Sequence, residues 1–434
     1  MITAIYWFRH DLRLMDNRAL VCACEEADEL TLVYVRHANE ESTTPWGFPV
    51  SSPLRRAFRD TAVDGLAVAI RERGGALLEL NGAPVTVLTD LSRVIGATRI
   101  YCEDIPAPEE RSDLAALRAA GLDVRATWQS TLLESADLPF DVAAMPEVFT
   151  SFRQRVERAG IRPQWPLAAP VVFPRMPSSA SLPYRPFTPS RLTLGPVAGS
   201  FPFGDPAFHG TEEAALAHVN RYFRSDLPTT YKATRNGLSG TDYSTKFSPW
   251  LAVGSLSPRT VFVALKKHEE VFGASDGSYW IWFELLWRDF FRFWSERHGV
   301  RLFRAEGLST LAPPSHDPIA FRRWCDGATG QRFVDAGMRE LKATGYLSNR
   351  LRQVVASYLV HDLGCDWRAG AAWFESQLID YDVCSNHGNW LYIAGRGADP
   401  RQGRRFDPEH QAAVYDPDAA YRALWALPTD SPSS

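Results

Sequence analysis

The sequence lacks the patterns typical of zinc-binding, secreted and membrane proteins. Its six cysteines are scattered and no two have CxxC spacing, which predicts no metal site and fits a reducing compartment. The first residues, MITAIYWFRHDLR, contain no basic segment followed by an apolar run, so we expect no signal peptide. No apolar run is long enough to cross a bilayer. We therefore expect a cytoplasmic protein without a membrane partner.

The sequence also lacks a strong excess of one charge. The 47 Lys and Arg residues nearly balance the 51 Asp and Glu residues, which excludes a generally basic nucleic-acid coat but not a local basic groove. Hydrophobic residues make up 45% of the chain, which argues against disorder. A length of 434 residues predicts two domains. The 14 tryptophans are more than is usual for a chain of this length. An aromatic-rich helical core explains most of them without a functional role.

Three regions follow one another along the chain. Residues 1–130 alternate short apolar runs with helical patterns such as Leu54–Arg73 and Arg111–Ala120, which predicts an α/β domain with a parallel, doubly wound sheet. The predicted strands are Ala4–Phe8, Thr31–Val35, Ala76–Leu80, Arg99–Cys102 and Val124–Thr127. No GxGxxG follows the first strand, so the sheet need not hold the main cofactor. Frequent prolines between Pro163 and Pro206 predict a connector over residues 131–210, and helical periods predict an all-α domain over residues 211–428.

The segment Tyr231–Pro258 carries hydroxyl and ammonium donors before a predicted helix that starts at Ser248-Pro249 and stops at Gly254. These donors are Ser244, Thr245, Lys246 and Ser248. Such a group at a helix N-terminus favours a phosphate site. A capped helix after a polar turn is the alternative. Ser257-Pro258 predicts a second helix start, for Arg259–Val271.

The segment Tyr279–His298 is a strongly aromatic helix in which Glu284, Trp287 and Arg288 share one face. A carboxylate and a guanidinium inside an apolar helix need partners. An intrahelical Glu284–Arg288 pair and a polar ligand both satisfy that need.

Two further polar patterns follow. Asn349 and Arg352 share one helix face, while a buried stripe is predicted at Val355, Leu359 and Leu363. The pattern fits an anionic ligand or a solvated face. In LIDYDVCSNHGNWLY, two carboxylates precede a predicted polar turn that contains Asn386, Gly388 and Asn389. This turn lacks the ligand spacing of a calcium loop, and a plain loop is the alternative.

Five motifs in order make the chain resemble a known family. They are RNGLSGTDYSTKFSPWLAVGSLSPR, FELLWRDFFRF, TGYLSNRLRQ, DWRAGAAWFESQLIDYDVCSNHGNWLY and GADPRQGRRFDPEHQA. The sequence from Trp7 to Trp425 resembles the photolyase/cryptochrome family, specifically its cryptochrome DASH branch. The resemblance implies FAD in a helical domain and light-driven repair of pyrimidine dimers in DNA.

The resemblance also implies which residues hold the cofactor. Those matching the family's FAD site are Tyr231, Ser244, Thr245, Lys246, Phe247, Ser248, Arg288, Asn349, Arg352, Asp380, Asp382 and Asn386. Asn386 matches the position that faces flavin N5. Arg352 and Asp380 are expected to form a buried pair beside the ring, where a guanidinium favours the anionic reduced flavin.

A cavity for a flipped cyclobutane dimer is implied as well. It would be lined by Glu284, Trp287, Asn349, Gln353, Asn386 and Tyr392. Gln353 and Tyr392 stand where classical photolyases carry Met and Trp, so less apolar surface offsets the extraction of a dimer from duplex. Single-stranded DNA is therefore the expected substrate. The (6-4) photolyases carry His at the position of Asn349, which argues against (6-4) repair.

The implied accessory groups are an electron chain and an antenna. Trp390 and Trp367 match the inner two of the family's three electron-transfer tryptophans, whereas Pro314 occupies the outermost position. Trp324, Trp373 or a tyrosine would have to take over. Glu109 or Glu110 could hold the branch's folate antenna, 5,10-methenyltetrahydrofolate, although an exposed helix start also explains them.

Two functions compete for this sequence. The first is a deoxyribodipyrimidine photolyase that acts on DNA as a monomer, and the alternative is a signalling photoreceptor without efficient repair. Such receptors usually carry a long C-terminal tail, whereas this sequence stops shortly after Trp425, which favours the enzyme. An electron-transfer flavoprotein without DNA contact is disfavoured by a predicted basic cluster at the cavity mouth. The cluster consists of Arg396, Arg401, Arg404 and Arg405.

Overall fold

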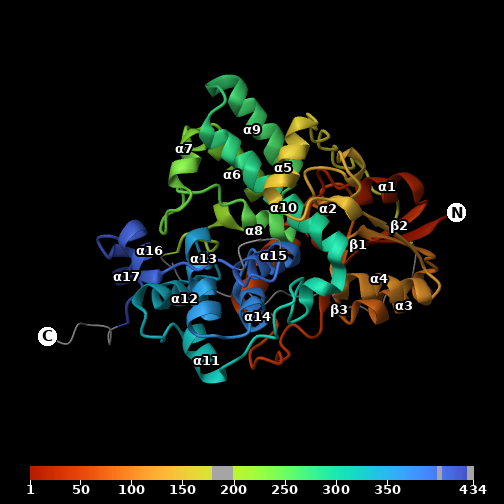
Figure 1. Ribbon diagram of the computed structural model, residues 1–434. Helices are drawn as coiled ribbons and strands as arrows, with labels where there is room; N and C mark the ends of the chain where they lie inside the picture. Colours follow the sequence, from red (N-terminus) through yellow and green to blue (C-terminus); the bar gives the residue numbers. More distant parts are fainter. Residues whose placement is uncertain (178–198, 398–402, 428–434) are drawn as a thin grey trace.

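The computed structural model describes residues 1–177, 199–397 and 403–427, and it confirms the predicted α/β domain followed by a helical domain. All five predicted strands form and pair in parallel, in the order β3-β2-β1-β4-β5. Their bounds are β1 Thr3–Phe8, β2 Glu29–His37, β3 Leu77–Gly82, β4 Arg99–Glu103 and β5 Asp123–Thr127. Figure 1 shows the sheet near the N-terminus, with the helical domain extending toward the C-terminus.

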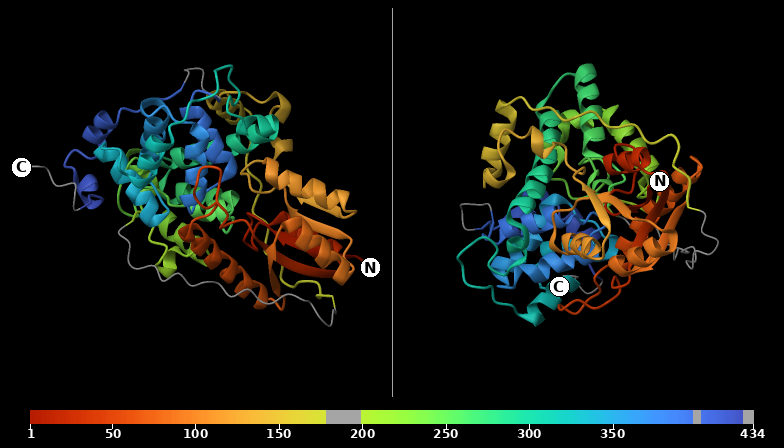
Figure 2. Two further views of the ribbon diagram at one scale, coloured as in Figure 1. Left: turned by 90° about the horizontal axis from the view of Figure 1, so that it is seen from below. Right: turned by 90° about the vertical axis from the view of Figure 1, so that its right-hand side faces the viewer.

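Helices cover both faces of the sheet because its strands are apolar on both sides. Alternate residues of β1 face opposite ways: Tyr6 and Phe8 pack with α1 (Arg18–Glu26) and α2 (Pro53–Arg71). Ile5 and Trp7 pack with α3 (Pro84–Ile95) and α4 (Pro108–Ala119). The two views of Figure 2 show this layered unit beside the helical domain. The prediction of a doubly wound sheet is therefore confirmed.

The strand order reverses between β1 and β4, which places a crevice at the carboxyl ends of these strands. Arg9 and His10 follow β1 directly. Gly254 fits against this turn with φ +76, and a Cβ at Gly254 would lie 1.8 Å from the carbonyl oxygen of His10. Only glycine allows the helical domain to approach the sheet so closely at this point.

The region between the domains contains one helix and several short turns. These are α5 (Phe149–Arg158), η1 (Ser135–Asp137), η2 (Val142–Ala144) and η3 (Pro206–Phe208). Residues 161–170, which include Pro163, form no helix or strand, as predicted for a proline-rich connector. Residues 178–198 of that connector lie outside the described part of the chain.

The described residues after Phe208 form helices and no strand. The helices are α6 Glu212–Phe223, α7 Leu227–Thr234, α8 Ser248–Val253, α9 Pro258–Phe272, α10 Asp276–His298, η4 Gly299–Phe303, α11 Pro318–Asp326, α12 Arg332–Thr344, α13 Asn349–Ser357, η5 Tyr358–Asp362 (a π turn), α14 Trp367–Gln377, α15 Val383–Ile393, α16 Pro408–Tyr415 and α17 Ala420–Leu424. Helix α10 starts with a capping box between Ser275 and Ser278, and its aromatic residues form much of the central core.

Two local predictions are wrong. The expected polar turn at Asn386–Asn389 is part of helix α15, because the Asp382 side chain caps it by accepting from the Ser385 N–H (2.8 Å). Gly388 is needed for packing rather than for a turn, since a Cβ there would lie 2.1 Å from the Phe291 ring. The second wrong prediction is the Ser248 cap of α8. The N-cap of this helix is Phe247, which makes no side-chain cap bond. The Ser257 cap of α9 is confirmed.

A buried ion network joins the two domains. The Arg259 side chain, 1% exposed, donates to Asp16 (2.9 Å) after β1 and to Glu134 (2.7 Å) in the connector. Asp16 also accepts from the Ser257 hydroxyl and from the Leu167 N–H (3.1 Å). Because Arg259 and Asp16 are buried, loss of Arg259 leaves the Asp16 charge without an ion-pair partner, and loss of Asp16 leaves Arg259 with Glu134 alone.

Asp16→Ala is expected to lower the free energy of unfolding by about 3 kcal/mol, because Arg259 keeps only one of its two carboxylates in a buried site. Asp28→Ala removes an ion pair whose two partners are each more than half exposed. This substitution should change the free energy of unfolding by less than about 1 kcal/mol. Denaturant titration of the two variants measures the difference. Equal stabilities would show that the network does not hold the interface.

Candidate functional site

Two adjoining cavities lie inside the helical domain. The larger, which we call the helical cavity, has a volume of about 410 Å³ and lies among α7, α8, α10, α13 and α15. The smaller, the inner cavity, has a volume of about 130 Å³ and shares Asn349, Arg352 and Asp380 with it. The walls carry both cationic and anionic side chains, which suits a large ligand with several polar groups.

The structure brings the residues selected from the sequence together, although they come from separate segments. The helical cavity is lined by Tyr231, Ser244, Thr245, Lys246, Phe247, Ser248, Glu284, Trp287, Arg288, Asn349, Arg352, Gln353, Asp380, Asp382 and Tyr392. Asn386 and Trp390 line the inner cavity. Trp367 lines neither and is 1% exposed.

Lys246 is the most unusual group in the helical cavity. Its side chain is 1% exposed, its ammonium has no hydrogen-bond partner, and its φ is +57. Burial lowers the pKa of Lys246 well below its usual range. Helix α8 is only six residues long, so the anion-binding character of this segment comes from the ammonium and hydroxyl groups rather than from a helix end. An anion entering here would give Lys246 its missing partner.

His218 of α6, which the sequence motifs did not indicate, holds the Lys246 segment in place. Arg221 donates to its Nδ1 (3.1 Å), so its Nε2–H donates to the carbonyl oxygen of Thr245 (2.9 Å). Burial lowers the pKa of His218 to about 4, so the ring is neutral at physiological pH. No sequence signal marks this residue, because a histidine on the apolar side of a helix is usually a core residue.

The expected pair of Arg352 and Asp380 is present. Arg352 Nη2 donates to Asp380 Oδ2 (2.8 Å), and the Asp380 side chain is 1% exposed. Ser248 donates to the same oxygen (2.7 Å), while Asp380 Oδ1 has no partner. This free acceptor in the cavity wall is suited to a ligand N–H or hydroxyl.

A second buried guanidinium, Arg292, was not selected from the sequence. It donates to Asp382 (3.0 Å) and to Glu103 at the end of β4 (3.3 Å). Burial alone would raise the pKa of Asp382, but Arg292 and Arg288 outweigh it and lower the pKa below its usual range. Burial raises the pKa of Glu103 to about 7, against the opposing effect of Arg292. The reasoning applied to Arg288 would have found this residue, since Arg292 lies in the same apolar helix.

The intrahelical Glu284–Arg288 pair is not formed, so that prediction is wrong. Glu284 pairs instead with Arg235, just after α7, while Arg288 donates to the backbone carbonyls of Ser130 and Leu251 (3.3 Å for the latter). Burial raises the pKa of Glu284, although Arg235 opposes this effect.

Trp287 lies between an aromatic support and the cavity. Phe149 at the start of α5 stacks on it, with ring centroids 3.8 Å apart and planes 14° apart. Tyr392 meets it edge-on at 6.3 Å. The Oε1 of Gln353, also on this wall, has no partner. The wall therefore combines flat apolar surface with free polar atoms.

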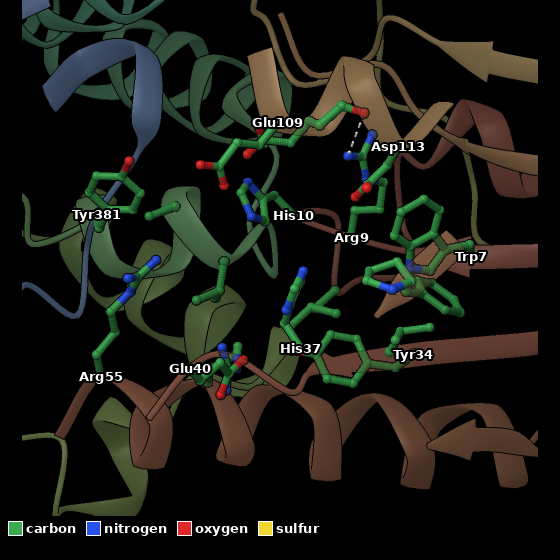
Figure 3. A pocket seen from close by; sticks show the side chains of 18 of the residues that line it. Trp7, Arg9, His10, Tyr34, His37, Glu40, Arg55, Glu109, Asp113 and Tyr381 are labelled. Atoms are coloured by element: carbon green, nitrogen blue, oxygen red, sulfur yellow. Dashed lines mark hydrogen bonds and ion pairs between the residues drawn. The ribbon is translucent and has the colours of Figure 1, made fainter. Parts of the chain in front are cut away.

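A third cavity is the crevice between the domains, at the point where the strand order reverses. Its volume is about 440 Å³, and both Glu109 and Glu110 line it. Figure 3 shows His10 near the centre, Glu109 above it, and Arg55 and Tyr381 across from Trp7. Burial raises the pKa of Glu110, although Arg9 opposes this effect. Ala252 lines both the crevice and the helical cavity, so only a thin wall separates them.

The predicted basic cluster at the cavity mouth is only partly present. Arg396 is buried and donates to the carbonyls of Leu311 and Ala312, which corrects its assignment to the mouth. Arg401 lies outside the described residues. Arg405 pairs with Asp362 (2.6 Å), and Arg404 lies over the Tyr392 ring at 5.1 Å. Of the described members of this cluster, Arg404 is the one that contacts a ring lining the helical cavity.

Among the described residues, no group of three or more His, Cys, Asp or Glu side chains could hold a metal ion. No helix in the described ranges is long and apolar enough to cross a membrane.

Two protein-family models match the chain. The model of DNA photolyase matches residues 4–171, and the model of the FAD binding domain of DNA photolyase matches residues 280–429. Cryptochrome DASH of Natronomonas pharaonis is 43% identical over 441 residues, covering 98% of this chain and 90% of the relative. Cryptochrome DASH of Vibrio parahaemolyticus is also 43% identical, covering 97% and 92%.

Solved structures agree with these matches. A cryptochrome of Synechocystis has a TM-score of 0.92 and 40% identity, covering 98% of this chain and 88% of that structure. A class III photolyase of Agrobacterium tumefaciens has a TM-score of 0.80 and 28% identity, covering 98% and 86%.

Lys246→Met should have opposite effects on the protein with and without FAD. Without FAD, the variant should be more stable by about 1–2 kcal/mol, because an unpaired buried amine is removed. The affinity for FAD should fall about tenfold or more, because a charge-assisted hydrogen bond is lost. Thermal unfolding of the stripped protein and flavin titration measure the two effects.

Lys267→Met, on the exposed side of α9, is the matched control and should change neither quantity. A Lys246→Met variant that binds FAD like the parent would contradict the assignment of Lys246.

Proposed function

The chain belongs to the cryptochrome DASH branch of the photolyase/cryptochrome family, and on this premise we propose that it binds FAD in the helical cavity and repairs cyclobutane pyrimidine dimers in DNA, preferably single-stranded DNA, when it absorbs blue light. The observation that carries the proposal is the pair of unpartnered polar atoms in that cavity, the Lys246 ammonium and Asp380 Oδ1. Unpaired buried groups each cost about 1–3 kcal/mol, so a ligand is expected to complete them.

The residues present fit FAD. Lys246 and the hydroxyls of Ser244 and Thr245 match a diphosphate, while Asp380 Oδ1 matches an N–H or hydroxyl of the rings or ribose. When bound and reduced, FAD supplies the electron that splits the dimer. Arg352, held by Asp380, places a positive charge at the cavity wall and favours the anionic reduced form. The Asn386 side chain is fixed by donating to the Ala371 carbonyl (3.0 Å), which keeps its amide in one orientation.

Trp287, Gln353 and Tyr392 form the proposed surface for the dimer. The stack on Phe149 fixes the Trp287 ring, so the dimer rings meet a rigid aromatic wall. Gln353 Oε1 offers an acceptor for a polar edge. This wall has less apolar surface than a Trp and Met pair would give, which supports single strands as the better substrate because opening a duplex costs a few kcal/mol.

Glu284 has the proposed role at the thymine edge. Burial raises the pKa of Glu284, and a proton on this carboxyl would let it donate a hydrogen bond to a dimer carbonyl and stabilise the negative charge that develops there. In the structure Arg235 pairs with Glu284, so Arg235 must release this carboxyl when the dimer enters. Arg235 would then be free to bind a backbone phosphate.

Positive groups near the mouth support DNA as the partner. Arg350 donates to Asn236 (3.1 Å) and lies over the Tyr415 ring, and Arg404 lies over the Tyr392 ring. A guanidinium held on an aromatic ring, as Arg350 is on Tyr415, can exchange that contact for a phosphate. Such contacts position the strand without reading its sequence.

The crevice is the proposed antenna site. Glu109 and Glu110 offer acceptors for the ring edge of 5,10-methenyltetrahydrofolate, and Arg9 and Arg55 offer cations for its carboxylates. The shared wall at Ala252 would keep the two chromophores close. The chromophore released by acid from the purified protein identifies the antenna.

The cellular setting belongs to the proposal as well. The six free cysteines support a reducing compartment such as the cytoplasm, and we expect a monomer. Light signalling is the second candidate, since the relatives are named cryptochromes. It would take first place if the fully reduced protein repaired dimers on no substrate.

Repair of a dimer should be faster in a single strand than in a duplex by on the order of tenfold or more, because stacking and pairing must be given up in the duplex. A dimer in a bubble should be repaired nearly as fast as in a single strand. Initial rates at one salt concentration measure this, since phosphate contacts depend on salt.

The matched variant combines Gln353→Met with Tyr392→Trp. This double variant should repair dimers in duplex DNA faster than the parent does, so its single-strand and duplex repair rates should differ less. If single strand and duplex are repaired equally by the parent protein, the argument from the cavity wall is wrong.

Glu284→Gln should slow repair by about tenfold on every substrate while leaving FAD content unchanged, because a neutral amide stabilises the developing charge less well. Repair by chemically reduced protein under light is the measurement. Glu270→Gln, on the exposed end of α9, should repair like the parent. A Glu284→Gln variant with the parent's rate would place Glu284 outside the reaction.

A further inference from the structure

The aromatic contacts of Trp367 lead to a histidine and a phenylalanine rather than to another tryptophan. Its ring meets His387 at 6.2 Å, and His387 meets Phe303 at 4.2 Å. Neither ring is a good electron donor, and Trp367 itself is 1% exposed. Pro314 has no aromatic ring to continue the path. In the described part of the chain, the route through Trp367 therefore offers no tryptophan nearer to water.

A different tryptophan lies against Trp390. The ring of Trp324 in α11 meets Trp390 edge-on, with centroids 6.3 Å apart. The Phe374 ring contacts both tryptophans, with its centroid 5.1 Å from that of Trp390 and 6.2 Å from that of Trp324. Trp390 lines the inner cavity, so this contact begins at the proposed flavin site.

The same aromatic series continues from Trp324 to the surface. Phe321, one turn away in α11, stacks on Trp324 at 6.0 Å and meets Trp46 at 6.4 Å. Trp46 is half-buried in the loop between β2 and α2. Two hydrogen bonds of 2.8 Å attach this loop to helix α14: Ser52 donates to the Ser376 carbonyl, and Ser376 donates to the Pro49 carbonyl.

The two tryptophans differ in how they can lose a proton. Trp324 is fully buried and its indole N–H donates to the Val355 carbonyl (2.9 Å), so an oxidised Trp324 keeps its proton and returns easily to the neutral state. Trp46 has access to water, which can take the indole proton and trap the radical. The arrangement is that of a buried relay followed by a terminal donor.

We propose that Trp390, Trp324 and Trp46 form the electron path by which light reduces the bound flavin, in place of a path through Trp367. The inference rests on the proposed FAD site. Trp390 gives one electron to the excited oxidised flavin, Trp324 refills Trp390, and Trp46 refills Trp324. Trp46 then loses its indole proton to water, and an external thiol returns one hydrogen atom to the neutral radical. Phe321 and Phe374 are spacers and are not oxidised.

The test compares single Phe substitutions at Trp324, Trp46 and Trp367 in the FAD-containing protein, under blue light with a thiol and without DNA. Trp324→Phe and Trp46→Phe should lose most of the light-driven flavin reduction. Trp367→Phe should keep it. Transient absorbance gives a second readout: the long-lived neutral tryptophanyl radical should be missing in Trp46→Phe and should form more slowly in deuterated water in the parent.

Trp282→Phe is the matched control, because Trp282 packs against Phe262, away from the path, and its loss should change neither readout. FAD content, and repair after chemical reduction, should be unchanged in Trp324→Phe, which separates a failed path from a misfolded variant or a failed repair function. Loss of reduction in Trp367→Phe with normal reduction in Trp46→Phe would overturn the proposal. A parent protein that light and thiol cannot reduce would overturn it too.

Discussion

The buried guanidinium of Arg292 joins the sheet to the ligand site, and much of the architecture depends on it. It lies between Glu103 at the carboxyl end of β4 and Asp382 at the start of α15. Asp382 also caps α15, the helix that carries Asn386, Trp390 and Tyr392. A buried ion pair is stable only while both charges are kept, so the position of α15 relative to the sheet is fixed electrostatically.

Helix α10 carries Arg292, and other residues of the same helix contact the helical cavity and the connector. Glu284, Trp287 and Arg288 face the helical cavity, whereas Asp289 accepts from the backbone N–H groups of Leu132 and Leu133 in the connector (2.8 Å each). Burial raises the pKa of Asp289 to about 7, although these two N–H groups oppose the effect. One helix thus holds the connector, the sheet and one wall of the cavity. The wall of the cavity on α10 is therefore anchored to both the sheet and the connector.

Several buried polar atoms without a hydrogen-bond partner lie in the wall of the helical cavity, and others lie elsewhere, including Arg259 Nη2 between the domains. Arg259, Asp16 and Ser257 bond to one another in full burial, yet Lys246, Asp380 and Gln353 keep free atoms in the cavity wall. A folded protein tolerates such groups when a bound partner completes them.

The sequence by itself determined most element types and most of the residues that line the helical cavity. Alternating apolar runs predicted every strand, because a doubly wound sheet buries both of its faces, and the ordered motifs predicted which side chains share one cavity. Partners remote in the sequence were decided only by tertiary structure. Glu284 took Arg235 rather than Arg288, the Asn386–Asn389 turn became helix because Asp382 caps it, and Trp324 came to lie against Trp390. Local spacing cannot specify these pairs, since each depends on how two helices cross, and that crossing is set by the packing of the whole core.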